Sequence, residues 1–242
     1  MQGTNVRIES FAGLDQLPRQ ERIDALRRRM EAISPTVVAT QQIYTEVTSE
    51  ADVLSVEPLL GGILPGGGLA RKAVTLMDES PYLAIEVMAH VASQGGVVGV
   101  VGWPHLCFAQ MIEYGDILSN IVVVPEPGIE PLSVVATLAE GLDLVFCYLP
   151  QMEVTPSRAR PFLSKLRRGT AAVVLVGAEL AAPAARIRSK ILHFHGIGSG
   201  TGRIQTVEIE VTAHTKNFPM RCATVGIGKP LKAPSRPALA AV

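Results

Sequence analysis

The chain has 242 residues, of which 48% are hydrophobic and 18% are charged, a composition that excludes a disordered, highly charged chain and allows one large domain or two small ones. Lys and Arg number 22 and Asp and Glu number 22, so the formal net charge is zero, which by itself argues against a generally basic nucleic-acid-binding protein. The zero is a cancellation, because residues 73–157 hold ten acids and no Lys or Arg, whereas the chain from Arg158 onward holds fourteen bases and three acids.

The first predicted element is an amphipathic helix that begins near Pro18, a residue suited to the first turn of a helix. Its apolar positions recur at spacings of three and four residues and are Ile23, Leu26, Met30 and Ile33. Charged residues fill the other faces, so the helix either packs on its own domain or docks on a partner. This helix and an acidic connector make up the predicted N-terminal segment, residues 1–52.

A predicted core occupies residues 53–228 and opens with a glycine-rich stretch at 59–68, a pattern typical of a tight turn that feeds a strand. Apolar, β-branched runs then alternate with helical patterns. The predicted strands are 73–77, 97–101, 121–124, 142–148 and 171–176, and the predicted helices are 82–93, 106–114, 131–140 and 156–168. We therefore expect an α/β fold with a doubly wound, mostly parallel sheet flanked by helices.

The pattern changes after Gly177. Strand-like runs at 190–194, 204–213 and 221–227 have polar, glycine-rich connections, which predicts an antiparallel C-terminal extension of the sheet. Residues 229–242 contain three prolines and are predicted to form a flexible tail. Because the N-terminal helix and the tail both lie outside the core, their residues are the candidate partner-docking residues. These are Ile23, Leu26, Met30, Ile33, Lys229, Lys232 and Arg236.

The loop after the first core strand is the place where chemistry is expected. In an open parallel sheet, ligands bind at the carboxyl ends of the strands, and phosphates bind a glycine-rich loop that opens the first helix. At this position the chain holds Asp78, Glu79, Ser80, Pro81 and Tyr82. A phosphate loop needs glycines, a lysine and a hydroxyl residue, but this segment has no Gly and no Lys, and its two carboxylates repel phosphate. The glycine-rich pieces at 61–68 and 196–202 also lack the Lys and are interpreted as turns.

The order of these pieces resembles the RecA-type ATPase core over residues 53–228. The stretch 59–69 is similar to that family's lead-in to its phosphate loop, 83–90 to the helix after the loop, and 114–128 to the third-strand region. The run 142–148 resembles the strand that normally ends in a magnesium-associated Asp, but Tyr148 stands at that position. The resemblance implies a RecA-like core with a degenerate nucleotide site, without cofactor, metal or catalytic residue.

Among RecA-like proteins, the chain resembles the ImuA and SulA group and, within it, the ImuA-prime family of catalytically inactive accessory proteins. That resemblance implies a non-catalytic subunit of a translesion-synthesis mutasome in the DNA-damage response. The implied partners are an ImuB-like inactive Y-family polymerase homologue and an error-prone C-family polymerase, and self-association is a further candidate interaction. Two alternatives stay open, a stand-alone RecA-like protein that binds single-stranded DNA and a SulA-like inhibitor of cell division.

Basic residues of the C-terminal region are candidate nucleic-acid contacts, because RecA-like proteins carry the loops that face single-stranded DNA in this region. They are Arg186, Arg188, Lys190, Arg203, Lys216 and Arg221. Such residues contact phosphates while neighbouring aromatic side chains stack on bases. The alternative is that they solvate one side of the fold and complement its acidic half.

The histidines and cysteines give weak signals. Cys107, Cys147 and Cys222 have no CxxC or Cys/His spacing, so neither a disulfide framework nor a zinc site is predicted. His193 and His195 would share one face of a strand, and His214 could approach them in a hairpin. A metal site needs a third ligand with defined geometry, so these histidines are interpreted as ordinary core or surface residues.

Trp103 and the ends of the chain complete the predictions. Trp103 follows the strand 97–101 at the carboxyl edge of the sheet, and we expect it to pack in the core rather than to cap the vacant pocket. Residues 1–20 show no secretory signal, and no run of 18 apolar residues predicts a membrane span. The protein is therefore predicted to be cytoplasmic.

Overall fold

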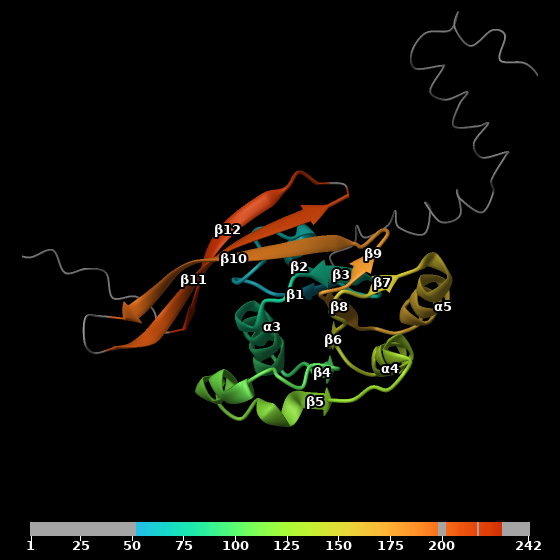
Figure 1. Ribbon diagram of the computed structural model, residues 1–242, viewed down its shortest axis with the longest axis horizontal. Helices are drawn as coiled ribbons and strands as arrows, with labels where there is room; N and C mark the ends of the chain where they lie inside the picture. The colour runs from blue at the N-terminus through green and yellow to red at the C-terminus, as the bar shows by residue number, and fades with distance from the viewer. Residues whose placement is uncertain (1–51, 198–201, 217, 229–242) are drawn as a thin grey trace, which may run out of the picture. The chain divides into compact units, whose positions relative to one another are not determined.

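The fold is dominated by one eight-stranded sheet (Figure 1). A computed structural model describes residues 52–197, 202–216 and 218–228 of the chain. In spatial order the strands are β12 (Arg221–Gly228), β11 (Gly202–Thr215), β10 (Ala185–Ile197), β3 (Val74–Met77), β8 (Ala172–Val176), β6 (Leu144–Tyr148), β4 (Val98–Val101) and β5 (Ile121–Val124). All neighbours from β10 to β5 are parallel, whereas β11 is antiparallel to both β10 and β12. The predicted mostly parallel sheet with an antiparallel C-terminal extension is confirmed.

Three α-helices connect the parallel strands, and each begins at a proline. They are α3 (Pro81–Ser93), α4 (Pro131–Leu138) and α5 (Pro156–Leu166). Proline suits the first helical position because its ring presets the helical φ angle and the missing N–H would have no partner inside the helix. Three short 3-10 helices and two small sheets complete the described elements. These are η3 (Pro65–Gly67), η4 (Phe108–Tyr114), η5 (Leu118–Asn120), β1 (Val53–Ser55) with β2 (Gly68–Ala70), and β7 (Glu153–Val154) with β9 (Glu179–Leu180).

Two apolar cores lie on the two faces of the sheet. Figure 1 shows α3 on one side of the parallel strands and α4 and α5 on the other. The α3 core includes Met88 and Phe146, and the core under α4 and α5 includes Phe162 and Leu175. Because both faces are covered, every residue of β3, β4 and β8 is buried. The continuous apolar runs in the sequence reflect the burial of these strands on both faces of the sheet.

Strand β10 belongs to both halves of the sheet. Its first residues, Ala185 to Ile187, pair in parallel with Thr75 to Met77 of β3, and the rest of the strand pairs with β11. The prediction placed this strand at 190–194 and missed its beginning, because the alternating Arg186, Ile187 and Arg188 pattern does not resemble the apolar parallel strands. This start is the part of β10 that joins the extension to the parallel sheet.

The segment predicted as a helix at 106–114 forms the 3-10 helix η4 instead. Met111 is its only buried residue, and Ile112 is 67% exposed, so the segment lacks the apolar stripe that an α-helix needs for packing. Side-chain hydrogen bonds hold it on α3. Gln110 donates to Glu86 Oε1 over 2.6 Å, and the Tyr114 hydroxyl donates to the other carboxylate oxygen. Burial and the Glu86 carboxylate raise the pKa of Tyr114.

Two predicted segments fall outside the described residues. They are the helix with Ile23, Leu26, Met30 and Ile33 and the tail with Lys229, Lys232 and Arg236. Within the ranges that are described, no helix has the length and apolar content to cross a membrane.

Candidate functional site

The connection from β3 to α3 lies at the carboxyl edge of the sheet, where phosphate is bound in nucleotide-binding relatives of this architecture. The strand ends at Met77, and the helix begins at Pro81. Only Asp78, Glu79 and Ser80 lie between them. Ser80 is the N-cap residue and is buried, but its hydroxyl makes no capping hydrogen bond. A connection this short leaves no loop to wrap around a phosphate group.

Asp78 ties this connection to β10. Its carboxylate accepts hydrogen bonds from the Ser189 backbone N–H over 2.8 Å and from the Ser189 hydroxyl over 3.0 Å. The backbone N–H of Asp78 donates to the carbonyl oxygen of Ile187 over 3.2 Å, directly after the last parallel pair of β3 and β10. The Asp78 side chain therefore continues the hydrogen-bond ladder beyond the point where the two main chains separate.

Glu79 reaches across the edge in the opposite direction, toward β6. The Tyr148 hydroxyl, at the end of β6, donates to Glu79 Oε2 over 3.0 Å. The Tyr148 ring stacks on Trp103, with ring centroids 5.2 Å apart and planes inclined by 12°. Trp103 is only 3% exposed and belongs to the α3 core, which confirms the prediction that it packs. The tyrosine at the expected Asp position is thus fixed by a ring below it and a carboxylate at its tip.

The groups bonded to Asp78 and Glu79 do not offset the charge of these two carboxylates. Asp78 and Glu79 place two carboxylates at the start of α3, and their partners Ser189 and Tyr148 are neutral. Partial desolvation and the hydrogen bond to Glu79 raise the pKa of Tyr148, so the phenol stays protonated and keeps donating at neutral pH. The arrangement offers carboxylate oxygens and an exposed Tyr82 ring, and its three backbone positions contain no glycine that would bring N–H groups close to an anion.

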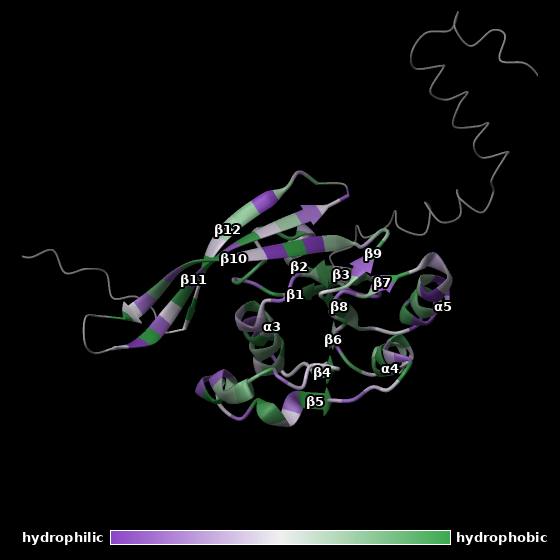
Figure 2. Cartoon of the chain, in the orientation of Figure 1, coloured by the Kyte–Doolittle hydropathy of each residue, from purple (hydrophilic) through white to green (hydrophobic). Residues whose placement is uncertain are grey.

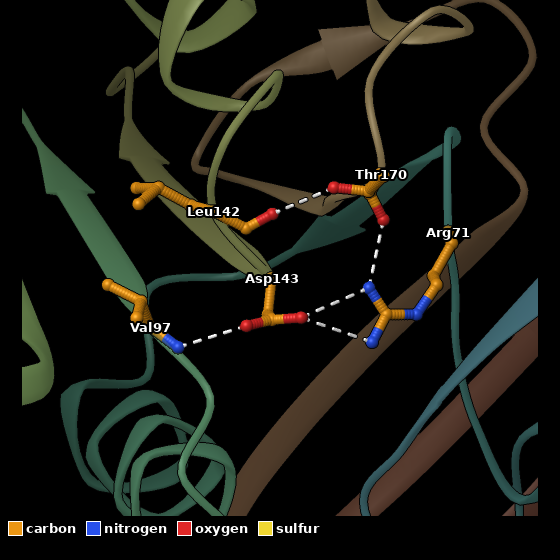
Figure 3. Close-up of polar contacts among 5 residues, drawn as sticks. All are labelled: Arg71, Val97, Leu142, Asp143 and Thr170. Carbon is orange, nitrogen blue, oxygen red and sulfur yellow. Dashed lines mark hydrogen bonds and ion pairs between the residues drawn. The ribbon is translucent and has the colours of Figure 1, made fainter.

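The amino edge of the same sheet holds a different polar cluster (Figure 3). Both Arg71 Nη1 and Nη2 lie 3.3 Å from Asp143 Oδ1, and Arg71 Nη1 also donates to the carbonyl oxygen of Thr170 over 2.9 Å. The second Asp143 oxygen accepts from the Val97 backbone N–H over 3.1 Å. These contacts join the starts of β4, β6 and β8 to the residue that follows β2. We interpret the cluster as structural, because it joins four chain segments and lies at the edge opposite to the ligand-binding edge of parallel sheets.

The register of the extension divides the candidate nucleic-acid residues into groups. Arg186, Arg188 and Lys190 alternate along β10 and lie on one face of it. Arg221 is paired with Ala213 and therefore lies on the opposite face. Lys216 follows the end of β11, and Arg203 lies near the free end of the β10–β11 hairpin. Figure 2 shows the alternation of hydrophilic and hydrophobic positions along β10 and β11.

Arg186 has a partner that the sequence pattern does not reveal. Its guanidinium binds Glu179, which lies in β9, through two contacts of 2.7 and 2.6 Å. The bidentate pair lowers the pKa of Glu179, and the hydrogen bond to Glu179 raises that of Arg186. No local spacing signals this pair, because it depends on how β9 and β10 follow β8.

The histidines occupy the same face as Arg186, Arg188 and Lys190. His193 and His195 are paired with Glu208 and Thr206 of β11, and His195 Nε2 lies 3.2 Å from Glu208 Oε2. The expectation that His214 approaches them is wrong, because His214 is paired with Arg186 near the other end of the hairpin. Across the described ranges, no group of three or more His, Cys, Asp or Glu residues has an arrangement that could hold a metal ion.

The comparisons with known proteins give a family, a relative and a similar solved structure. The family model of the MT3502 N-terminal domain matches residues 62–182, half of the chain, which run from the glycine-rich turn through β9. The chain belongs to the MT3502 N-terminal domain family. The chain is also 27% identical over 198 residues to the uncharacterized protein Rv3395c of Mycobacterium tuberculosis, and this match covers 79% of the chain and 90% of the relative.

A solved structure is also similar to this chain. It is the crystal structure of the RadB recombinase, with 15% sequence identity and a TM-score of 0.46, and the match covers 68% of this chain and 92% of that chain. The arrangement described above, in which parallel strands alternate with covering helices and an antiparallel extension follows, is the expected α/β class.

Proposed function

We propose that this protein is a non-catalytic RecA-fold accessory subunit that acts through protein contacts in a translesion-synthesis mutasome. The observation that carries the proposal is the closed carboxyl edge, where Asp78 is bonded to Ser189 and Glu79 to Tyr148. A connection that carries carboxylates and has no glycine or lysine does not supply the donors with which a RecA-type ATPase binds phosphates there.

The parallel sheet then serves as a rigid scaffold. Without a bound γ-phosphate, assembly is not switched by nucleotide hydrolysis, and partner binding depends on surfaces of the scaffold and on the segments outside it. The proposed partners are an ImuB-like inactive Y-family polymerase homologue and an error-prone C-family polymerase, as the resemblance to the ImuA-prime family implies. The DNA-damage response is the proposed setting for the same reason.

Nucleotide binding is the direct test of the closed edge. Calorimetry with the full chain, ATP and Mg²⁺ should give no saturable binding tighter than about 1 mM, and the purified protein should release no phosphate from ATP. The Asp78→Ala variant serves as the control for contamination, because a contaminating ATPase gives equal activity in both preparations. Micromolar ATP affinity in the wild type that this variant changes in either direction would contradict the proposal.

Partner binding is tested by affinity capture. Tagged full-length protein from cells exposed to DNA damage should retain the ImuB-like protein, and a chain that lacks residues 229–242 tests whether the tail is the docking segment. Capture of a cell-division protein in place of a polymerase homologue would favour the SulA-like alternative. Capture of neither class by the full-length protein would remove the mutasome proposal.

A second candidate function, direct binding of single-stranded DNA, is favoured by the row formed by Arg186, Arg188 and Lys190 on one face of β10. Because Arg186 is engaged by Glu179, the test uses the double variant of Arg188→Ala and Lys190→Ala. Fluorescence anisotropy with a labelled oligonucleotide should show weaker binding and a salt slope that is smaller by about two. Replacing Arg158 and Arg160, two exposed bases of α5, by Ala provides the matched control.

A further inference from the structure

Strand β12 forms one end of the eight-stranded sheet, and no other described strand lies beyond it. Its pairing with β11 runs from Arg221 to Gly228 without a register shift, so the strand has no bulge. Between Cys222 and Gly228 it contains no proline and no charged residue. Natural proteins protect such edges with bulges, lysines, prolines or a covering segment, because the unpaired N–H and C=O groups pair readily with another strand. β12 has none of the first three.

The side chains of β12 separate cleanly by face. Ala223, Val225 and Ile227 pair with the buried residues Val211, Ile209 and Val207 of β11, and they extend the α3 core toward the edge. Thr224 lies on the other face, opposite Glu210, and is exposed. A strand added along β12 with the same alternation would extend both the apolar face and the polar face of the sheet.

Exposed apolar side chains lie near both ends of this edge. Phe218 and Met220, which precede the start of β12, are 43% and 67% exposed. At the other end, β11 continues past the pair formed by Thr206 and Gly228 to Ile204, which is 48% exposed. A partner that covers the whole edge would therefore need apolar groups at both of its ends.

We propose that β12 pairs with β12 of a second copy of this chain, antiparallel and about a two-fold axis near Thr224. A two-fold axis places the exposed Met220 of each copy beside the Gly228 end of the other, which is the end of β12 nearest to the exposed Ile204 of β11. The two Arg221 side chains, the only charges on the strand, lie at opposite ends of the pair. A parallel pair would bring them together, which selects the antiparallel arrangement.

The other end of the sheet is a poorer candidate for the same pairing. Strand β5 spans Ile121–Val124, half the length of β12, and offers correspondingly few unpaired backbone groups. The inference about β12 does not depend on the proposed mutasome role, because it uses only the geometry of this edge.

The test measures association of the full chain by analytical ultracentrifugation over a range of concentrations. The wild type should approach twice the mass of one chain. Thr224→Lys should weaken association by about tenfold or more, because the two lysines would face each other across the axis. Thr137→Lys on α4, another exposed threonine, adds the same charge away from the edge and should leave association unchanged.

A charge-swap experiment separates edge pairing from misfolding. Thr224→Glu alone should also weaken association, whereas an equimolar mixture of Thr224→Lys and Thr224→Glu should restore it as a heterodimer. A wild type that stays monomeric up to about 100 µM would overturn the proposal, since such an association is weaker than most specific interfaces. The proposal would also be overturned if Thr224→Lys left association intact. It would be overturned as well if the mixture did not restore association although both variants kept the wild-type circular dichroism.

Discussion

The amino and carboxyl edges of the parallel sheet treat their carboxylates in different ways. At the amino edge, Asp143 is held by the Arg71 guanidinium and a backbone N–H, so its charge is balanced by a cation. At the carboxyl edge, Asp78 and Glu79 are held by Ser189 and Tyr148, which carry no charge. Both arrangements join chain segments, but only at the carboxyl edge, where related architectures bind anions, do the carboxylates lack a bonded cation.

This difference shows two ways in which one parallel sheet holds carboxylates at its edges. The carboxylates need only hydrogen-bond donors that the neighbouring strands already carry, and the Trp103 ring under Tyr148 supplies the rigid support. Variants at the two edges should therefore differ in size of effect, in tolerance of an isosteric amide and in pH dependence.

The largest effect is expected from Trp103→Ala. Removing a side chain that is 3% exposed and stacked on Tyr148 should lower the free energy of unfolding by about 3–5 kcal/mol. Trp103→Phe keeps a ring under Tyr148 and should cost less. Urea denaturation measures both variants, and equal losses would mean that neither the volume nor the stacking of a phenyl ring at this position stabilises the fold.

A smaller loss is expected from Asp143→Asn, by about 1–3 kcal/mol. Both Asp143 oxygens accept from donors, one from Arg71 and one from Val97, so an amide nitrogen would face a donor in either orientation. Thermal or urea unfolding measures the loss. Glu140→Gln, an exposed carboxylate nearby in the chain, is the control and should have little effect. A loss as small as that of the control would mean that the Asp143 contacts do not stabilise the fold.

The sequence predicts the parallel core well because burial on both faces leaves a direct signature. The apolar runs of β3, β4, β6 and β8 and the prolines at the starts of the three helices place these elements within a few residues. The beginning of β10 is missed, since Arg186 and Arg188 alternate with buried neighbours only because the strand leaves the covered part of the sheet. Segment 106–114 shows the reverse error, in which a helical pattern forms a 3-10 helix held by Glu86.

The candidate site could be predicted only in part. The absence of Gly and Lys after β3, and Tyr148 in place of an Asp, are visible in the residues themselves. The hydrogen bonds of Asp78 and Glu79 cannot be predicted from the sequence, because Asp78 and Ser189 are 111 positions apart, and Glu79 and Tyr148 are 69 apart. Such contacts depend on the order of the strands in the sheet, and the local sequence pattern does not show this order.

Tyr148→Phe should have a modest effect that depends on pH. Losing an exposed hydrogen bond to Glu79 should cost about 0.5–1 kcal/mol near neutral pH. Because the pKa of Tyr148 is raised in the folded protein, its contribution is complete below the ordinary tyrosine pKa of 10.0 and declines as the pH rises above it. Unfolding free energies measured from about pH 8 to about pH 11 should therefore converge for wild type and variant. Tyr114, whose pKa is also raised, is present in both proteins and cancels in the comparison. A constant difference across this range would contradict the assigned hydrogen bond.

Asp78→Asn is expected to have the smallest effect, below about 0.5 kcal/mol. Here the amide satisfies both contacts, since its oxygen accepts from the Ser189 N–H and its nitrogen donates to the Ser189 hydroxyl, which can accept. The same substitution at Asp143 has no such option, so the ratio of the two losses in urea denaturation measures the contrast between the edges directly.

Asp78→Asn also removes one negative charge from the carboxyl edge. Calorimetry should still detect no ATP binding, because neutralising Asp78 supplies neither the glycines nor the lysine of a phosphate loop. Equal losses at Asp78 and Asp143 would mean that the carboxyl edge also relies on its charge, and the distinction between the two edges would fail.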